Sequence, residues 1–175
     1  MSEQEQVKPV VPPQAGSPNK YRPYLWVFFL AFPFMMNGLK SGDLDGKAPY
    51  ILPVTAQLNF NGRAIKLEVA RTKKALSHGL TYRDALENDR GMLYKVTSDT
   101  YFTGRGMKFP TALVFLRAGK VVDIQQVQPC EDRESKCLEY RTNILNDEVI
   151  EVKVGVPNKL GITVGSTLNI TYLPY

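Results

Sequence analysis

Polar and hydrophobic residues alternate along the chain on both sides of an Asn-Gly pair. Apolar side chains occupy every second position of 54–60 and, after Asn61-Gly62, every second position of 65–69. A period of two is typical of a β-strand with one buried face. Asn-Gly favours the positive φ angles of a type I′ turn. The pattern therefore predicts a β-hairpin over residues 54–69.

Two short helices are predicted after this hairpin. Thr72 can cap a helix over 73–78, and Gly79 stands just past its end, where glycine commonly terminates helices. Thr81 and Asp84 form a capping-box pattern that predicts a second helical piece over 82–86.

The pattern of strands returns beyond Gly91. Short runs rich in β-branched and apolar residues predict strands at 92–96, 112–116, 120–126, 149–154 and 167–172, and a tight Ala118-Gly119 connection joins the second to the third. Several short strands with little helix indicate a mainly β domain, a sandwich or barrel with a short helical insert. We place this β-rich domain at residues 54–175.

The N-terminal part differs in composition. Residues 1–20 are polar and proline-rich, which predicts a flexible arm. Residues 21–40 contain a nearly continuous apolar run over 24–36, and residues 41–53 are rich in Gly, Asp and Pro, as expected of a linker. The apolar run carries many aromatic side chains: Tyr24, Trp26, Phe28, Phe29, Phe32 and Phe34.

Three interpretations of the hydrophobic segment stay open. The 17 uncharged residues between Arg22 and Lys40 span about 26 Å as a helix, slightly less than the roughly 30 Å of a bilayer core. We favour an uncleaved signal anchor, with Lys20 and Arg22 holding the N-terminus in the cytoplasm. A cleaved signal peptide, which would leave the domain secreted, and a buried segment of the globular domain are the alternatives, and Pro33 gives the last some support.

Composition and charge exclude several classes of protein. The chain has 175 residues, 43% of them hydrophobic, as in ordinary globular proteins. Its net charge of +5 falls to +3 for residues 41–175, and the densest basic run, at 63–74, lacks interleaved aromatics. We therefore expect a solvated surface and no nucleic-acid partner. One His and two Cys are too few for most metal sites, so we expect neither a metal nor a cofactor.

The two cysteines lie seven residues apart in a charged loop. A disulfide between Cys130 and Cys137 would stabilise the fold by roughly 2.5 kcal/mol in the loop-entropy model. We favour this bond over a redox dithiol, because the spacing is not Cys-x-x-Cys and the neighbours are acidic. Such bonds persist outside the cytoplasm, in agreement with a membrane-anchored or exported domain.

Several short segments together carry a resemblance to a known family. They are LEVART (67–72), HGLTYRDAL (78–86), GMLY (91–94), FP (109–110), GKVVDI (119–124), PC…C…Y (129–140) and VIEVKVG (149–155). In order and spacing, the stretch from Leu67 to Tyr172 resembles the bacterial and archaeal family called domain of unknown function 192. The resemblance implies a mainly β, jelly-roll-like sandwich, often behind a signal peptide or membrane anchor, and no established reaction.

The chain departs from the family pattern at two places. The family usually has Phe-Trp-Met-Lys-Asn-Thr where this chain has residues 102–107 (FTGRGM), and Pro-Leu-Asp where it has 110–112 (PTA). If the family residues line a site, an indole and a carboxylate are absent here. The resemblance therefore supports the fold more than any inherited ligand-binding or catalytic role.

Candidate binding residues are few, and no catalytic residue is identified. Arg83 could pair with a buried carboxylate, which we favour, or bind an anion. Arg105 lies in a glycine-rich turn whose amides could bind an anion, although the glycines more simply permit a sharp loop. Met107 and Tyr140 complete the candidate ligand site. His78 follows Ser77 at a predicted helix end, where adjacent side chains diverge, so we interpret it as a structural or surface residue.

The leading functional hypothesis is a membrane-anchored, extracytoplasmic accessory or binding protein. We expect it to be non-enzymatic and to act by protein–protein contact within or beside a membrane complex, with lipid and membrane proteins as partners. The alternative is a β-sandwich that binds a small ligand or carbohydrate, or an enzyme of unassigned reaction, with its site near Arg83, Met107 and Tyr140. A third possibility is a soluble cytoplasmic protein with free thiols.

Overall fold

The computed structural model describes residues 47–97, 99–131 and 136–174. The predicted N-terminal arm (1–20), the hydrophobic segment (21–40) and the first part of the linker lie outside these ranges. Within them, no helix has both the length and the apolar character needed to cross a membrane. The anchor therefore stays a prediction.

Most of the described chain forms one curled sheet. Its strands follow the order β6-β5-β8-β3-β2-β1-β9, and a separate ribbon pairs β4 with β7. Neighbouring strands of the sheet are antiparallel except for the parallel pair β2 and β3. The strands are β1 (Val54–Phe60), β2 (Arg63–Ala70), β3 (Arg90–Lys95), β4 (Phe102–Thr103), β5 (Thr111–Arg117), β6 (Lys120–Val127), β7 (Glu139–Tyr140), β8 (Glu148–Lys153) and β9 (Asn169–Tyr172).

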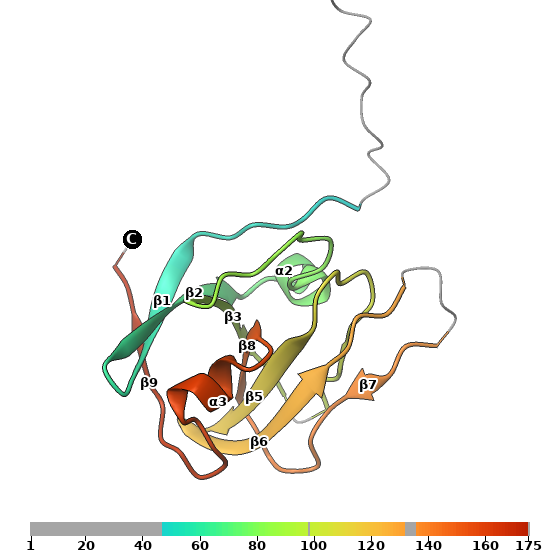
Figure 1. The fold of residues 1–175 in the computed structure, drawn as a ribbon. Helices are drawn as coiled ribbons and strands as arrows, with labels where there is room; N and C mark the ends of the chain where they lie inside the picture. Colours follow the sequence, from blue (N-terminus) through green and yellow to red (C-terminus); the bar gives the residue numbers. More distant parts are fainter. Residues whose placement is uncertain (1–46, 98, 132–135, 175) are drawn as a thin grey trace, which may run out of the picture. The chain divides into compact units, whose positions relative to one another are not determined.

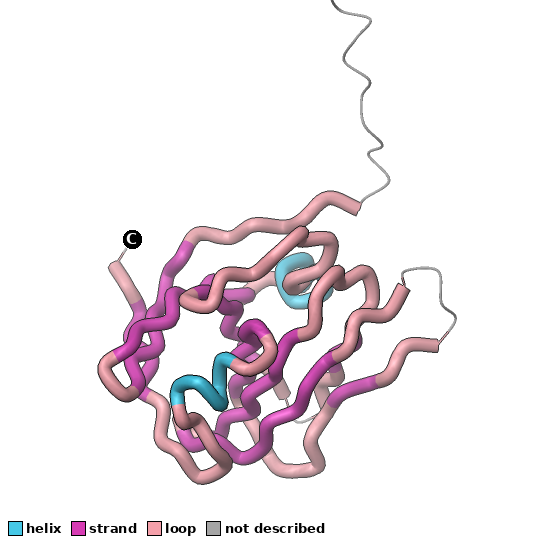
Figure 2. Tube along the Cα trace, in the orientation of Figure 1, coloured by secondary structure: helices cyan, strands magenta, loops and turns pink. Residues whose placement is uncertain are grey.

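The sheet curls until its two edges approach each other. An isolated bridge pairs Lys120, at the start of β6, with Thr167, just before β9. Nearby, the Leu168 amide donates to the Gly119 carbonyl over 2.8 Å. The result is a half-barrel, with α3 (Val156–Leu160) lying within the curl in Figures 1 and 2.

Both faces of the sheet are packed. The inner face forms one hydrophobic cluster that includes Leu67, Val114 and Ile150, together with Leu160 of α3. The outer face forms a second cluster, which includes Phe115 and is covered by α2 (Lys73–His78) and the loop after it. Because β5 lies between the two clusters, it reads as an unbroken apolar run rather than an alternating one.

The local predictions for the hairpins are confirmed. β1 and β2 pair with Leu58 opposite Ile65. Asn61 and Gly62 have φ angles of 47° and 73°, as a type I′ turn requires. Ala118 and Gly119 adopt the same conformation, with φ angles of 47° and 76°, between β5 and β6.

The helix predicted over 82–86 is wrong. Tyr82 has a φ of 63°, which a helix does not allow, and its amide donates to the Gly106 carbonyl over 2.9 Å. Asp84, predicted to complete the capping box, pairs with Lys108 instead. Contacts with a distant turn therefore override the local signal.

The prediction of a mainly β domain with a small helix is confirmed, and the strands lie in a half-barrel. Three short elements, β4, β7 and α3, were not predicted.

Candidate functional site

A cavity of about 480 Å³ opens beside the C-terminal end of α2. Its lining comprises residues 76–82, residues 101–103, Arg105, Met107 and Glu151. We call it the α2 cavity. Its walls come from three separate parts of the chain, so only the folded domain assembles it.

The end of α2 is fixed by its own backbone and by the sheet beneath it. The Thr72 hydroxyl caps the helix by accepting a hydrogen bond from the Ala75 amide over 3.1 Å. At the other end the Gly79 amide donates to the Ala75 carbonyl over 2.9 Å. A Cβ on Gly79 would lie 2.7 Å from the Tyr94 hydroxyl, so only glycine lets this corner approach the sheet so closely.

His78 and Ser77 line the α2 cavity but are engaged with their own helix. The Lys74 carbonyl lies 3.0 Å from His78 Nδ1 and also accepts from the Ser77 hydroxyl over 3.0 Å. His78 Nδ1 and Ser77 Oγ are 3.4 Å apart. Because both groups are directed to a backbone carbonyl, they do not form a ready nucleophile and base.

Glu151 is the acidic residue of the cavity lining. It lies on β8 opposite Met92 of β3, on the outer face of the sheet, and its side chain is 4% exposed. Its carboxyl accepts hydrogen bonds from the Tyr94 hydroxyl (2.6 Å) and the Thr111 hydroxyl (2.7 Å). Burial raises the pKa of Glu151, against the opposing effect of these two donors and the Arg83 charge. Burial also raises the pKa of Tyr94 well above its ordinary value.

A second buried glutamate lies in the same row of the sheet. Glu68 on β2 is opposite Met92 on β3, which in turn is opposite Glu151 on β8. Adjacent strands are about 4.8 Å apart, so the two glutamates are separated by roughly 10 Å at the backbone. The outer face therefore carries two buried acids on either side of one methionine.

Arg83 neutralises the charge of the Glu68 carboxylate and donates hydrogen bonds to it. Its two terminal nitrogens each donate to a different Glu68 oxygen over 2.7 Å, and Nη2 also reaches the Tyr50 carbonyl at 2.7 Å. The Leu52 amide donates to the same carboxylate over 2.8 Å. The buried Nε of Arg83 has no hydrogen-bond partner among the described residues. This bidentate pair is the arrangement that we favoured for Arg83 on sequence grounds.

Arg83 does not line the α2 cavity. It borders a separate hollow of about 450 Å³ with Glu68 and Leu86. Its terminal nitrogens are already occupied by protein acceptors, and its use by a ligand stays an untested prediction.

The glycine-rich turn that carries Arg105 is held by the segment before the first cysteine. Arg105 forms a parallel bridge with Cys130; the Cys130 amide donates to the Gly104 carbonyl over 2.8 Å, and the Gly106 amide donates to the Cys130 carbonyl over 2.9 Å. A Cβ on Gly104 would lie 1.9 Å from the Gln128 carbonyl oxygen. The turn therefore requires glycine because of close packing.

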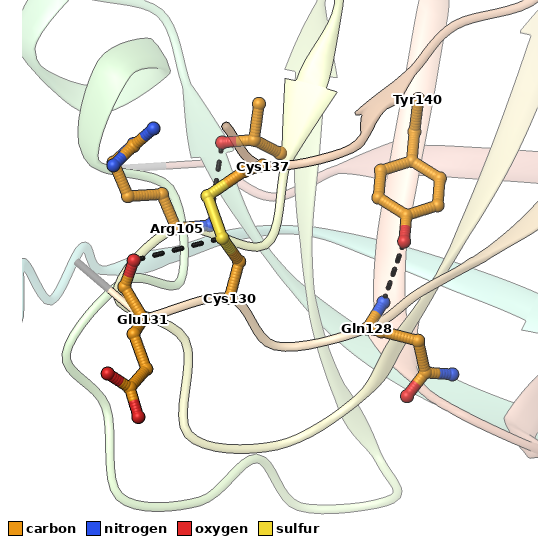
Figure 3. The surroundings of a disulfide bond; sticks show 7 residues. Arg105, Gln128, Cys130, Glu131, Cys137 and Tyr140 are labelled. Atoms are coloured by element: carbon orange, nitrogen blue, oxygen red, sulfur yellow. Dashed lines mark hydrogen bonds between the residues drawn. A yellow bond between two sulfur atoms is a disulfide. The ribbon is translucent and has the colours of Figure 1, made fainter. Parts of the chain in front are cut away.

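Cys130 and Cys137 form a disulfide, as predicted, with their Cα atoms 5.8 Å apart. Figure 3 shows the bond beside Arg105, whose side chain extends away from the sulfur atoms. Cys130 is thus hydrogen-bonded to the turn whose Arg105 lines the α2 cavity.

The remaining candidate residues are divided between two places. Met107, which is 8% exposed, lines the α2 cavity together with Arg105. Tyr140 on β7 pairs with Phe102 of β4, and its hydroxyl accepts from the Gln128 amide over 3.1 Å (Figure 3). Tyr140 is not part of the cavity lining, so the structure brings Arg105 and Met107 together and leaves Arg83 and Tyr140 apart.

Sequence reasoning missed Glu151, Tyr94 and Thr111. The available signal was a glutamate inside the apolar run VIEVKV, because a charged residue at the centre of a buried strand requires a partner. Three of the positions where the chain departs from the family motif, Thr103, Arg105 and Met107, also line the cavity. Among the residues that the structure describes, no group of three His, Cys, Asp or Glu could hold a metal ion.

The fold and the site together define a class: a β half-barrel with a short helix and a partly polar cavity on its outer face. The family model for domain of unknown function 192 (DUF192), described as "Uncharacterized ACR", matches residues 56–170. The chain belongs to this family.

Two solved structures share the fold. A protein from Sinorhizobium meliloti 1021, provisionally named a transcription regulator, has a TM-score of 0.55 and 18% identity, over 67% of this chain and 91% of that one. A protein of unknown function from Novosphingobium aromaticivorans has a TM-score of 0.55 and 20% identity, over 70% and 92% of the two chains. None of the curated proteins matches the chain. At these identities the similarity establishes the fold alone.

Proposed function

We propose that the protein is a membrane-anchored, extracytoplasmic binding protein whose β-rich domain takes up a small polar ligand in the α2 cavity. The observation that carries the proposal is a cavity of about 480 Å³ that contains a buried carboxyl group, that of Glu151. Small-molecule sites commonly enclose about 300–1,000 Å³ and place a few polar groups among apolar walls. The α2 cavity has both properties.

The proposed role is binding rather than catalysis. Two titratable groups of the cavity have protein partners: Glu151 accepts from Tyr94 and Thr111, and His78 contacts its own helix. A general base needs a free path to the proton that it removes. Glu151 and His78 are therefore arranged to contact a polar ligand rather than to transfer a proton.

The location of the domain is argued from the sequence and the disulfide. A structural disulfide persists in oxidising compartments, and the Cys130–Cys137 bond fits a domain exported by an N-terminal hydrophobic segment. As part of this proposal, residues 21–40 form an uncleaved anchor, and the strands are arranged in a jelly-roll-like manner.

Ligand screening by thermal shift tests the binding role. We would screen the full-length protein in mild detergent against small metabolites and compare Thr103→Trp, which fills the cavity, with Thr171→Trp on exposed β9. We expect at least one compound to raise the Tm of the wild type and of Thr171→Trp but not of Thr103→Trp. A screen without any such compound would contradict the proposal.

Membrane fractionation tests the proposed location. We expect the full-length protein in the membrane fraction, with Cys130 and Cys137 resistant to alkylation until a reductant is added. Soluble protein with two reactive thiols would contradict both the anchor and the extracytoplasmic placement.

A second candidate function is protein–protein contact within a membrane complex. The observation that favours it is a set of exposed apolar side chains on either side of β7, where Leu138 is 71% exposed and Leu145 is 56% exposed. Replacement of both by aspartate should release a co-purifying membrane protein, whereas Val164→Asp, at another exposed position, should not. Unchanged co-purification in the double variant would exclude this surface.

A further inference from the structure

Two charged residues line the α2 cavity and bear on which ligand it takes up, given the proposed binding function. Glu151 reaches it from β8 and Arg105 from the glycine-rich turn, so one buried acid and one base border the same space. A ligand that contacts both side chains must carry two different kinds of polar group.

Glu151 selects for hydrogen-bond donors. Each of its two carboxyl oxygens accepts one hydrogen bond, from Tyr94 or from Thr111. A carboxylate can accept about four, so capacity remains on both oxygens. An anionic ligand group next to this buried acid would be repelled, whereas a hydroxyl group would be accepted.

Arg105 selects for an anion. A guanidinium presents its donors in a planar fork that matches a carboxylate. The turn that carries Arg105 is held in place by two backbone hydrogen bonds with Cys130 and by the packing of Gly104 on Gln128. The Arg105 side chain extends away from the disulfide (Figure 3), and it lines the α2 cavity together with residues at the end of α2. The base is thus presented from a fixed backbone.

The rest of the lining suits an amphipathic ring. Hydroxyl groups come from Ser77 and Thr103, and aromatic rings come from Tyr82, Tyr101 and Phe102. A sugar ring presents hydroxyl groups at its rim and C–H groups on its faces, and it can therefore use both kinds of wall. A cationic amine would also suit Glu151 but would be opposed by Arg105.

We propose that the α2 cavity binds sugar acids, that is, polyhydroxylated carboxylates of monosaccharide size, with the ligand carboxylate on Arg105 and a ring hydroxyl donating to Glu151. The ligand is identified by this pairing of groups and by the cavity volume of about 480 Å³.

Isothermal titration of the full-length protein with three probes tests the proposal. The probes are D-glucuronate, which has both features, D-glucose, which lacks the carboxylate, and acetate, which lacks the ring. We expect D-glucuronate to bind at least tenfold more tightly than D-glucose, and acetate not to bind. Equal binding of glucuronate and glucose, or of glucuronate and acetate, would overturn the inference.

Substitution of Arg105 and of Glu151 provides a second test of the proposal. Arg105→Gln should weaken D-glucuronate binding at least tenfold and change D-glucose binding less than twofold, whereas Arg63→Gln, an exposed arginine outside the cavity, should change neither. Arg105→Lys should restore part of the glucuronate affinity. Glu151→Gln tests the other contact and should weaken both sugars by a similar factor. Unchanged glucuronate affinity in a folded Arg105→Gln variant would overturn the assigned pose.

The failure of this inference can be distinguished from failure of the proposed function. If glucuronate does not bind but another compound raises the Tm in a way that Thr103→Trp abolishes, the sugar-acid assignment is wrong and the binding function stands. If no compound does so, both are wrong.

Discussion

The hydroxyl of Tyr94 on β3 donates a hydrogen bond of 2.6 Å to the carboxyl of Glu151 on β8, where both side chains are almost fully buried. This bond joins adjacent strands, and Glu151 also lines the α2 cavity. It places a titratable acid in a position where its charge state affects the stability of the sheet.

The stability of the protein should depend on the protonation of Glu151. Its pKa is raised in the folded state from the ordinary value of 4.5, so the folded state holds the proton more tightly than the unfolded chain. The free energy of unfolding should therefore fall as the pH rises from about 4.5 through the folded-state pKa of Glu151.

Urea unfolding from pH 4 to pH 8 measures this effect when wild type is compared with Glu151→Gln. The difference between the two proteins isolates Glu151 from the other acids, because these titrate in both. We expect the wild type to lose stability relative to the variant with rising pH. Parallel curves would show that Glu151 does not titrate differently on folding.

Removal of only one member of the Arg83–Glu68 pair should strongly destabilise the protein. Arg83→Met leaves a buried carboxylate without its main partner, and loss of one member of a buried pair costs roughly 3–5 kcal/mol. Replacement of both residues, as in Glu68→Leu with Arg83→Met, should recover most of that loss, since no charge stays buried. Chemical denaturation of the two single variants and the double variant measures the coupling. Additive losses would contradict the prediction.

Gly104 should tolerate no side chain. The Cβ of Gly104→Ala would lie 1.9 Å from the Gln128 carbonyl oxygen, so the turn has to move, at a cost of roughly 3 kcal/mol by analogy with overpacked cores. Gly62→Ala is the control, because nothing lies within 4 Å there and only its φ of +73° is unfavourable, at about 1 kcal/mol. Thermal unfolding compares the two, and equal losses would argue against the close approach.

The disulfide should stabilise the domain and also the Arg105 turn. Cys130→Ser with Cys137→Ser should lower the free energy of unfolding by roughly 2.5 kcal/mol, because the unfolded chain gains loop entropy. Amide hydrogen exchange at Gly106 should be faster in this variant, since its amide donates to the Cys130 carbonyl. The Ala75 amide in α2 serves as a reference that should not change. Unaltered exchange at Gly106 would separate the disulfide from the turn.

The elements that could be predicted are those in which local and global preferences agree. Asn61-Gly62 sets its own turn, and Thr72 and Gly79 delimit α2, because each signal acts within a few residues. The false helix over 82–86 arose where two distant partners, Gly106 for the Tyr82 amide and Glu68 for Arg83, outweighed a local capping pattern.

The candidate site was harder to predict than the fold. Arg105 and Met107 were identified from the glycine-rich segment, and they do line the cavity. Glu151 reaches the same cavity from a strand more than 40 residues away, and its register against Met92 decides which face it occupies. The pairing of these two strands depends on the topology of the sheet, which cannot be predicted from short-range sequence patterns.

The near-closure of the sheet affects how copies of the protein behave together. In an open sheet, the unpaired amides and carbonyls of the edge strands offer a template on which other chains can add. Here the bridge between Lys120 and Thr167 turns the start of β6 toward the segment before β9, and the backbone of Val121 donates to the Ser166 carbonyl and accepts from the Gly165 amide. Each edge group satisfied in this way is withdrawn from intermolecular pairing, which guards against aggregation where many copies are crowded together.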